Sequence, residues 1–422
     1  MQGKVRIAAV CCLIIFILFS GSMLQQSLPT SDNHSDTFNS PFPRHIYSVP
    51  SGGMTVQLTA SVALSESQFD VLQHLTTQFE EEYPQIQIQL EQTAYPMSLE
   101  ALIHQLQLGT ASDVILVPND WVNDLAAMGL LTHIPSELSM HSEREHFSAV
   151  ISQLRWNGYT WGVPKDVEPY ALAYNEPIMQ QFGISPENLQ RMDGLIQYIQ
   201  SLAAGNAVGD GHVISLQVED SKAILNFLMP YYVLWQKEQQ SAEMQLESLI
   251  QASHEGEDAA ASFRVEAGDV KEWLEEGQFA LTVIPASQVR LLQSTSFQSS
   301  PLPAAEQGGS SGIVSGHSFV VTAGSEAKEE ALLWLNQVTS VQAQLEFYDA
   351  GGAFPTLKSA YEQADWKDAL EPIRDELERG QSLPGKPGTA QKMTDFSVMW
   401  SKFAEGEISA NALFGAIESI IN

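Results

Sequence analysis

The sequence contains few cysteines and few basic residues. Both cysteines, Cys11 and Cys12, lie in an apolar run near the N-terminus. The rest of the chain therefore cannot form a disulfide, a thiolate nucleophile or a cysteine-based metal site. Only 20 Lys and Arg residues balance 51 Asp and Glu residues, which gives a net charge of −31. Nucleic acids and anionic membrane surfaces are poor partners, because both require a basic patch.

The N-terminus has the pattern of an export signal. Lys4 and Arg6 precede the apolar run, and small residues follow it at 20–22. The run reaches about 18 residues if it is extended to Leu24, which is marginal for a membrane span. Residues 1–24 are therefore predicted to be either a cleaved signal peptide or a retained anchor. Residues 25–53 are polar and aperiodic, and we expect a flexible spacer there.

From residue 54 onward the pattern is that of a globular chain. Hydrophobic residues make up 44% of the sequence, enough to form cores. Alternating or short apolar strands are predicted at 54–60, 86–90, 114–117, 171–175, 279–285 and 318–322, with helices between many of them. The order of strands and helices in the first part favours an α/β domain with a parallel sheet. A Gly/Ser/Pro-rich stretch at 295–312 is expected to be a loop.

Two places along the chain carry acids where a ligand could be held. Asn119, Asp120 and Trp121 follow the strand at 114–117, and ligands bind beyond the carboxyl ends of parallel strands. Asp166 and Glu168 lie on an extended segment between Pro164 and Tyr170. Asp120 could instead cap the next helix, because Asp is a favoured N-cap residue. Glu168 could simply be a solvated residue between two strands.

A set of short motifs resembles the family 1 extracellular solute-binding proteins of ABC importers, the group that contains maltose-binding protein. The motifs occur in the family order, and they are FEEEYP at 79–84, SDVI at 112–115, WGVP at 161–164, YN at 174–175, GQFALT at 277–282, GGAFP at 351–355 and GEISANAL at 406–413. The resemblance covers roughly residues 54–420. It implies a two-lobed α/β fold in which strands cross at a hinge and the lobes close on a ligand.

The resemblance also implies domain limits. Lobe I would comprise 54–165 with about 314–355, and lobe II would comprise 166–313 with about 356–422. The first crossing would lie near Pro164–Tyr170 and the second near Gly312–Ser318, with Gly316 and His317 at the hinge.

In the family, acids at the positions of Asp120 and Glu168 hold sugar hydroxyls, a role that suits a carboxylate acceptor. Asp166 and Asn119 are secondary candidates. Stacking on a sugar ring is a possible role for four aromatic residues, for which core packing is the alternative. These residues are Trp121, Tyr170, Tyr231 and Trp235.

The chain departs from the maltose binders at two stacking positions. Ser287 stands where those proteins have a tryptophan after the Ala-Leu-Thr strand, and Met393 is the nearest match to a second tryptophan. The resemblance therefore implies a polar, sugar-like ligand other than maltose.

The leading hypothesis is a monomeric, exported, non-enzymatic binding component of an ABC importer that delivers a small polar solute to permease subunits. It would act outside the cell or in the periplasm, or anchored at the outer face of the cytoplasmic membrane. The alternative is a membrane-tethered sensor that signals to a partner. An extracellular hydrolase fits less well, because no carboxylate pair is placed as an acid/base couple. We expect no catalytic residue, cofactor or metal.

Overall fold

A computed structural model describes residues 55–93, 98–135, 143–204, 212–216, 220–254, 279–294, 296–303, 312–363 and 367–422. All of its elements belong to one compact unit, residues 52–422. The predictions for the apolar N-terminal run and the spacer fall outside the described residues.

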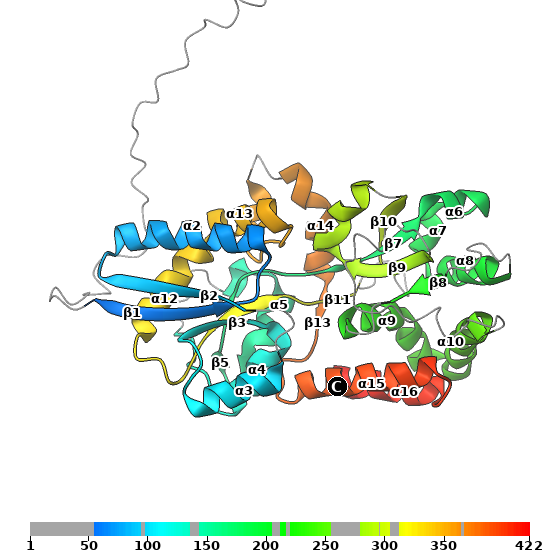
Figure 1. Cartoon of the computed structure of the whole chain (residues 1–422). Helices are drawn as coiled ribbons and strands as arrows, with labels where there is room; N and C mark the ends of the chain where they lie inside the picture. Colours follow the sequence, from blue (N-terminus) through cyan, green and yellow to red (C-terminus); the bar gives the residue numbers. More distant parts are fainter. Residues whose placement is uncertain are drawn as a thin grey trace, which may run out of the picture. The chain divides into compact units, whose positions relative to one another are not determined.

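The first sheet has five strands in the order β2-β1-β3-β12-β6, of which β1, β2 and β3 are labelled in Figure 1. They are β1 (Val56–Val62), β2 (Ile86–Gln92), β3 (Val114–Pro118), β6 (Val163–Pro164) and β12 (His317–Val321). β1 pairs in parallel with β2 and β3, whereas β12 is antiparallel to β3 and β6. The predicted strand–helix alternation is confirmed, but the sheet is mixed rather than wholly parallel. We call this sheet and the helices packed on it lobe I.

Local capping fixes the first helices of lobe I. Ser65 caps α2 (Glu66–Glu82), and Pro84 follows its last turn as the sequence predicts. Gly109 ends α3 (Leu99–Leu108) with φ 67°, a left-handed conformation that glycine adopts without a Cβ penalty. The other lobe I helices are α4 (Asn119–Ala127), η1 (Glu143–Glu145), α5 (Ser148–Leu154), α12 (Lys328–Val338) and α13 (Val341–Gly351).

The second sheet has four strands in the order β10-β7-β9-β8. They are β7 (Tyr170–Asn175), β8 (His212–Ser215), β9 (Phe279–Pro285) and β10 (Phe297–Pro301). The loop expected at 295–312 is wrong for Phe297–Pro301, which form β10, whereas 295 and 304–311 lie outside the described residues. Phe297 is buried against Phe279, and the segment pairs antiparallel with β7 despite its serines. Tertiary pairing therefore overrides the local turn-like composition. We call this sheet and its helices lobe II.

The lobe II core is formed by helices from two separate stretches of the chain. Large buried side chains from α9 and from α15 and α16 meet in one cluster, among them Tyr231, Trp400 and Phe414. The helices and turns of this lobe are α6 (Glu176–Gln181), α7 (Pro186–Leu189), α8 (Met192–Ala204), α9 (Ser221–Lys237), α10 (Gln239–His254), η3 (Ala286–Ser294), α15 (Thr389–Ala404) and α16 (Ala410–Ile421).

Residues 358–379 pack differently from the predicted lobe division. η4 (Lys358–Glu362) and α14 (Lys367–Arg379) contact α5 and α13, and Tyr361 and Leu377 share a buried cluster with Phe147 and Leu345. This stretch therefore packs with the lobe I helices, whereas Leu383 and residues of α15 and α16 join the lobe II core. Two short ribbons complete the fold: β4 (Arg155–Trp156) with β5 (Tyr159–Thr160), and β11 (Ile313–Val314) with β13 (Gln381–Ser382).

Helix α15 contacts both lobes. The Asp124 carboxylate of α4 accepts hydrogen bonds from the backbone N–H groups of Gly388 and Ala390 at the start of α15. The far end of the same helix places Trp400 and Phe403 in the lobe II core. A carboxylate at a helix N-terminus is favourable, because it satisfies free N–H groups and meets the positive end of the helix dipole.

Candidate ligand-binding site

The two chain segments that connect the lobes are hydrogen-bonded to each other. The first runs from β6 to β7 and the second from β11 to β12. Glu168 and Ser315 exchange backbone hydrogen bonds of 3.0 and 2.9 Å, and the N–H of Lys165 donates to the carbonyl of His317 at 2.9 Å. Pro164 is buried and pairs in register with Ser318. These hydrogen bonds form a short antiparallel ladder between the two segments, which contain the residues of the predicted hinge, Pro164, Gly316 and His317.

Gly316 allows the close approach of these crossings. Its φ is 146°, and a Cβ at this position would lie 2.4 Å from the backbone oxygen of Asp166. Only glycine fits this conformation and this distance.

A buried ionic cluster lies beside the ladder. Asp166 accepts hydrogen bonds from the Nζ of Lys165 at 3.0 Å and the backbone N–H of His317 at 2.8 Å, and its Oδ1 lies 3.1 Å from His317 Nδ1. The ammonium of Lys165 also lies 4.4 Å from the centre of the Phe347 ring. Burial raises the pKa of Asp166, but Lys165 and His317 outweigh this effect and hold the pKa well below its usual range. Both carboxylate oxygens of Asp166 are engaged within the chain, and its ligand-binding role stays a prediction.

Among the described residues, Glu168 forms no salt bridge with a Lys, Arg or His side chain. Its Oε1 accepts from the backbone N–H of Ser287 at 3.0 Å. Desolvation raises its pKa to about 8, further increased by the nearby charges of Asp166 and Asp220, although the bond from Ser287 acts in the opposite direction. Glu168 is therefore mostly protonated at neutral pH and can both donate and accept a hydrogen bond there.

Asp120 connects the two lobes directly. It lies in the first turn of α4, one position beyond Asn119, and Pro118 rather than Asp120 is the N-cap residue. Its Oδ1 accepts from the Nζ of Lys222, on α9 of lobe II, at 2.7 Å. The side chain of Asp120 is 6% exposed and that of Lys222 is 19% exposed, so the pair is largely removed from water. The acid predicted from the sequence is thus held between the lobes by a lysine that the sequence did not single out.

Further polar groups surround this ion pair. Tyr170 donates its hydroxyl to Asp220 at 3.2 Å, and Asp220 also caps α9 by accepting from the backbone N–H groups of Lys222 and Ala223. Burial raises the pKa of Asp220, although these hydrogen bonds act in the opposite direction. The Oδ1 of Asn119 accepts from the Ser318 hydroxyl at 2.6 Å, while its buried Nδ2 lacks a hydrogen-bond partner among the described residues.

Two predicted stacking residues serve packing instead. Tyr231 is fully buried in the lobe II core, and Trp235 stacks on Phe414 at 5.6 Å while donating to Glu243. The stacking role predicted for these two is corrected to packing, because both side chains are buried. Trp121 is partly buried against the core of lobe I, and its stacking role stays a prediction. Tyr170 remains at the site, where it contributes its hydroxyl rather than an open ring face.

Some residues of the site could have been recognised in the sequence. An aspartate just before a helix with periodic apolar residues is a capping signal. Asp220 stands at such a position, and it could have been recognised as the N-cap of α9. Lys222 carries no local signal, because its partner Asp120 is distant in the chain and on the other lobe. Lys165 lies inside the predicted crossing, but its full burial follows from packing on Phe347.

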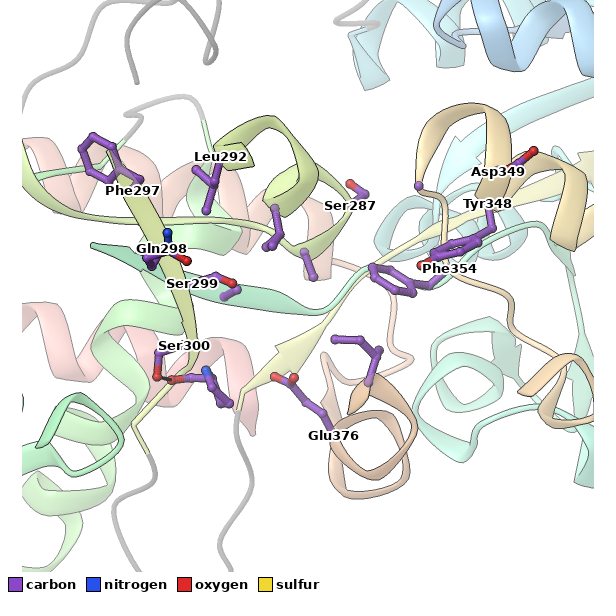
Figure 2. Close-up of a pocket in the computed structure, with 16 residues that line it drawn as sticks. Ser287, Leu292, Phe297, Gln298, Ser299, Ser300, Tyr348, Asp349, Phe354 and Glu376 are labelled. Carbon is purple, nitrogen blue, oxygen red and sulfur yellow. Dashed lines mark hydrogen bonds between the residues drawn. The ribbon is translucent and has the colours of Figure 1, made fainter. Parts of the chain in front are cut away.

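A pocket of about 630 Å³ lies beside β10, and its lining includes Ser287, whose N–H donates to Glu168 (Figure 2). Its lining includes Ala171 of β7, whereas the neighbouring Tyr170 reaches Asp220. Successive residues of a strand point to opposite faces of the sheet. The pocket and the Asp120–Lys222 site therefore lie on opposite faces of the lobe II sheet.

With this geometry established, comparison with known proteins identifies the family. The profile of the bacterial extracellular solute-binding proteins matches residues 74–372. The chain belongs to this family. Its fold is the two-lobed α/β fold of the periplasmic binding proteins, with hinge strands that cross between the lobes. The family and its structural neighbours are solute-binding proteins rather than enzymes.

Solved structures of similar fold support the assignment. The GacH receptor of Streptomyces glaucescens, studied unliganded and with acarbose, superposes with a TM-score of 0.70 at 16% identity, covering 87% of this chain and 97% of its own. The sugar-binding protein MalE of Xanthomonas citri gives 0.68 at 16% identity, with 87% and 96% covered. A Thermotoga lettingae solute-binding protein bound to α-D-tagatose gives 0.69 at 15% identity, with 87% and 98% covered.

The match to curated relatives covers a smaller part of each chain. A binding protein of Brucella abortus is 23% identical over 159 residues, and the match spans 37% of this chain and 37% of that protein. Family membership implies an exported protein. Among the residues that the structure describes, every helix is too short or too polar to cross a membrane.

Proposed function

We propose that this solute-binding protein captures a neutral, hydroxylated, sugar-like solute between its lobes and delivers it to an ABC permease. The observation that carries the proposal is the Asp120–Lys222 pair, which places an acceptor and a donor between the lobes beside Glu168, Asp220 and Tyr170. A polyol needs both kinds of group, and charged partners make its hydrogen bonds short and strong.

The charges of the site favour a neutral ligand over an anionic one. Lys222 is paired with Asp120, and Lys165 with Asp166, so both cations are already compensated. Glu168 is mostly protonated near pH 7, while Asp220 adds a further acidic group. An anionic sugar would therefore approach an acid-rich site without an available counter-ion.

Transport rather than signalling is the function we favour. The family and the fold are those of transporter components, and the sugar-binding neighbours support a sugar-like ligand. We further propose that the protein acts as a monomer at the outer face of the membrane, held by residues 1–24 through the spacer. A tethered sensor would share this anchor, so the anchor does not distinguish the two functions. Stimulation of a reconstituted permease by the purified chain would support transport, and lack of stimulation would favour the sensor.

A thermal-shift screen over sugars, amino acids, peptides and polyamines tests the ligand class. We expect a neutral mono- or oligosaccharide to stabilise the chain saturably and to reduce its radius of gyration. Stabilisation by a peptide or a polyamine alone would reject the sugar assignment and leave the fold intact.

Site variants then test the residues. Asp120→Ala and Glu168→Ala should each weaken sugar binding by roughly 1.5–3 kcal/mol, measured by calorimetry. Asp395→Ala is the matched control, because Asp395 is an exposed acid on α15. Unchanged affinity in both site variants would remove these residues from the site.

A further inference from the structure

The Asp120–Lys222 pair joins the first turns of two helices from different lobes. Asp120 is the second residue of α4 in lobe I, and Lys222 is the second residue of α9 in lobe II. The carboxylate and the ammonium are 2.7 Å apart, although 102 positions separate the two residues in the chain. The contact therefore requires the two lobes to be close together.

The helix dipole explains the position of Asp120 better than that of Lys222. The first turn of a helix carries a partial positive charge, which favours an acid and disfavours a base. Asp120 therefore suits its own helix, whereas Lys222 adds a positive charge to a turn that is already positive. Asp220, the N-cap of α9, lowers that cost, but the ammonium of Lys222 bonds to the acid of the other lobe. This arrangement favours an inter-lobe role for the lysine.

The two partners are attached to the segments that cross between the lobes. On the lobe II side, Asp220 accepts hydrogen bonds from the backbone N–H of Lys222 at 3.1 Å and from the hydroxyl of Tyr170 at 3.2 Å. Tyr170 is the first residue of β7 after the first crossing. On the lobe I side, the backbone N–H of Asn119 donates to the carbonyl of Gly316, on the second crossing, at 3.0 Å. A rotation at the crossings would therefore move the two partners relative to each other.

We propose that Asp120 and Lys222 form a latch that holds the lobes closed in part of the ligand-free molecules, and that Lys222 is the positioning residue for Asp120. The ammonium engages Oδ1 of Asp120, and among the described residues Oδ2 accepts no hydrogen bond. The carboxylate would thus be oriented, with one oxygen left to accept, only while the lobes are together.

The latch gives a physical reason for a solute to favour the closed form. A ligand shifts a conformational equilibrium only by its difference in affinity for the two states. A hydroxyl that bonds to Asp120 would bind more tightly where Lys222 has already oriented the carboxylate. This step rests on the proposed function, whereas the latch itself needs no solute.

Double electron–electron resonance between one spin label on each lobe tests the latch in the full chain without solute. Met128, at the end of α4, and Met244, on α10, are 53% and 60% exposed. Both are replaced by Cys for labelling, in a chain that carries Cys11→Ser and Cys12→Ser. We expect a population at the label separation that the structure shows. Lys222→Met should lower the ratio of this population to the remainder at least about tenfold.

Further variants distinguish a latch from a general loss of stability. Asp120→Lys alone should open the lobes as Lys222→Met does, whereas the exchanged pair, Asp120→Lys with Lys222→Asp, should restore most of the closed population. Lys358→Met is the matched control, because Lys358 forms an ion pair with Glu378 at 3.2 Å among the lobe I helices. This control should leave the ratio unchanged.

Four outcomes would overturn the latch. They are a ligand-free chain with no population at the label separation of the structure, an unchanged ratio in Lys222→Met, an equal shift in Lys358→Met, and an exchanged pair that stays open. Because no solute is present, these outcomes are independent of the thermal-shift screen. Failure of that screen would reject the sugar assignment and leave the latch standing.

Discussion

The Asp120–Lys222 ion pair gives the sharpest prediction, because it joins the lobes through a nearly buried contact. Replacing Lys222 by Met leaves the Asp120 carboxylate, whose side chain is 6% exposed, without its 2.7 Å partner. Breaking a buried pair costs about 3–5 kcal/mol, and an exposed pair contributes about 0–1 kcal/mol. Lys222 is 19% exposed, so we expect Lys222→Met to lower the free energy of unfolding by about 2 kcal/mol.

A double-mutant cycle isolates the pair from the other contacts of Lys222. The single variants Asp120→Asn and Lys222→Met and the double variant are unfolded in urea without ligand. We expect a coupling energy of about 1–2 kcal/mol. The exposed Lys358–Glu378 pair is the control, for which the same cycle should give less than about 0.5 kcal/mol. A coupling energy for Asp120 and Lys222 no larger than the control value would refute the reasoning.

Three further predictions concern single residues. The folded chain holds a proton on Glu168 up to about pH 8 that the unfolded chain releases near pH 4.5, so stability should fall as pH rises between these values. Glu168→Gln should flatten that fall in urea titrations, and identical profiles would contradict the raised pKa. Gly316→Ala should cost more than about 2 kcal/mol of stability, whereas Gly324→Ala, with open space around its Cβ, should cost less than half as much. Trp235→Ala should lower stability by about 3–5 kcal/mol without changing solute affinity. If the variant instead lost affinity at normal stability, Trp235 would contact the solute, and the packing role would be wrong.

Local signals were enough to predict most elements of the fold. Ser65 and Gly109 set helix limits through capping. The extended segment after Pro164 was predicted from its prolines and the aromatic residues that flank it. β10 was missed because its serines resemble a loop, and its strand geometry depends on pairing with β7. No property of the segment alone encodes that pairing.

The candidate site was only partly predictable for a similar reason. The positions of Asp120 and Glu168 follow from strand ends and family motifs. Glu168 lies on the first crossing segment, and Asp120 lies in the first turn of α4. Lys222 could not be assigned, because its role depends on the approach of the two lobes. The aromatic candidates failed where tryptophan and tyrosine were needed to fill the lobe II core, as Trp235 does.

The attachment of α15 to both lobes has a consequence for the timing of solute release. A change in the angle between the lobes would strain the contact between Asp124 and the start of α15, where two backbone N–H groups donate to the carboxylate. If these hydrogen bonds break when the lobes open, their loss adds to the barrier to opening. The lifetime of a closed complex would be set in part at Asp124, a residue that need never touch the solute.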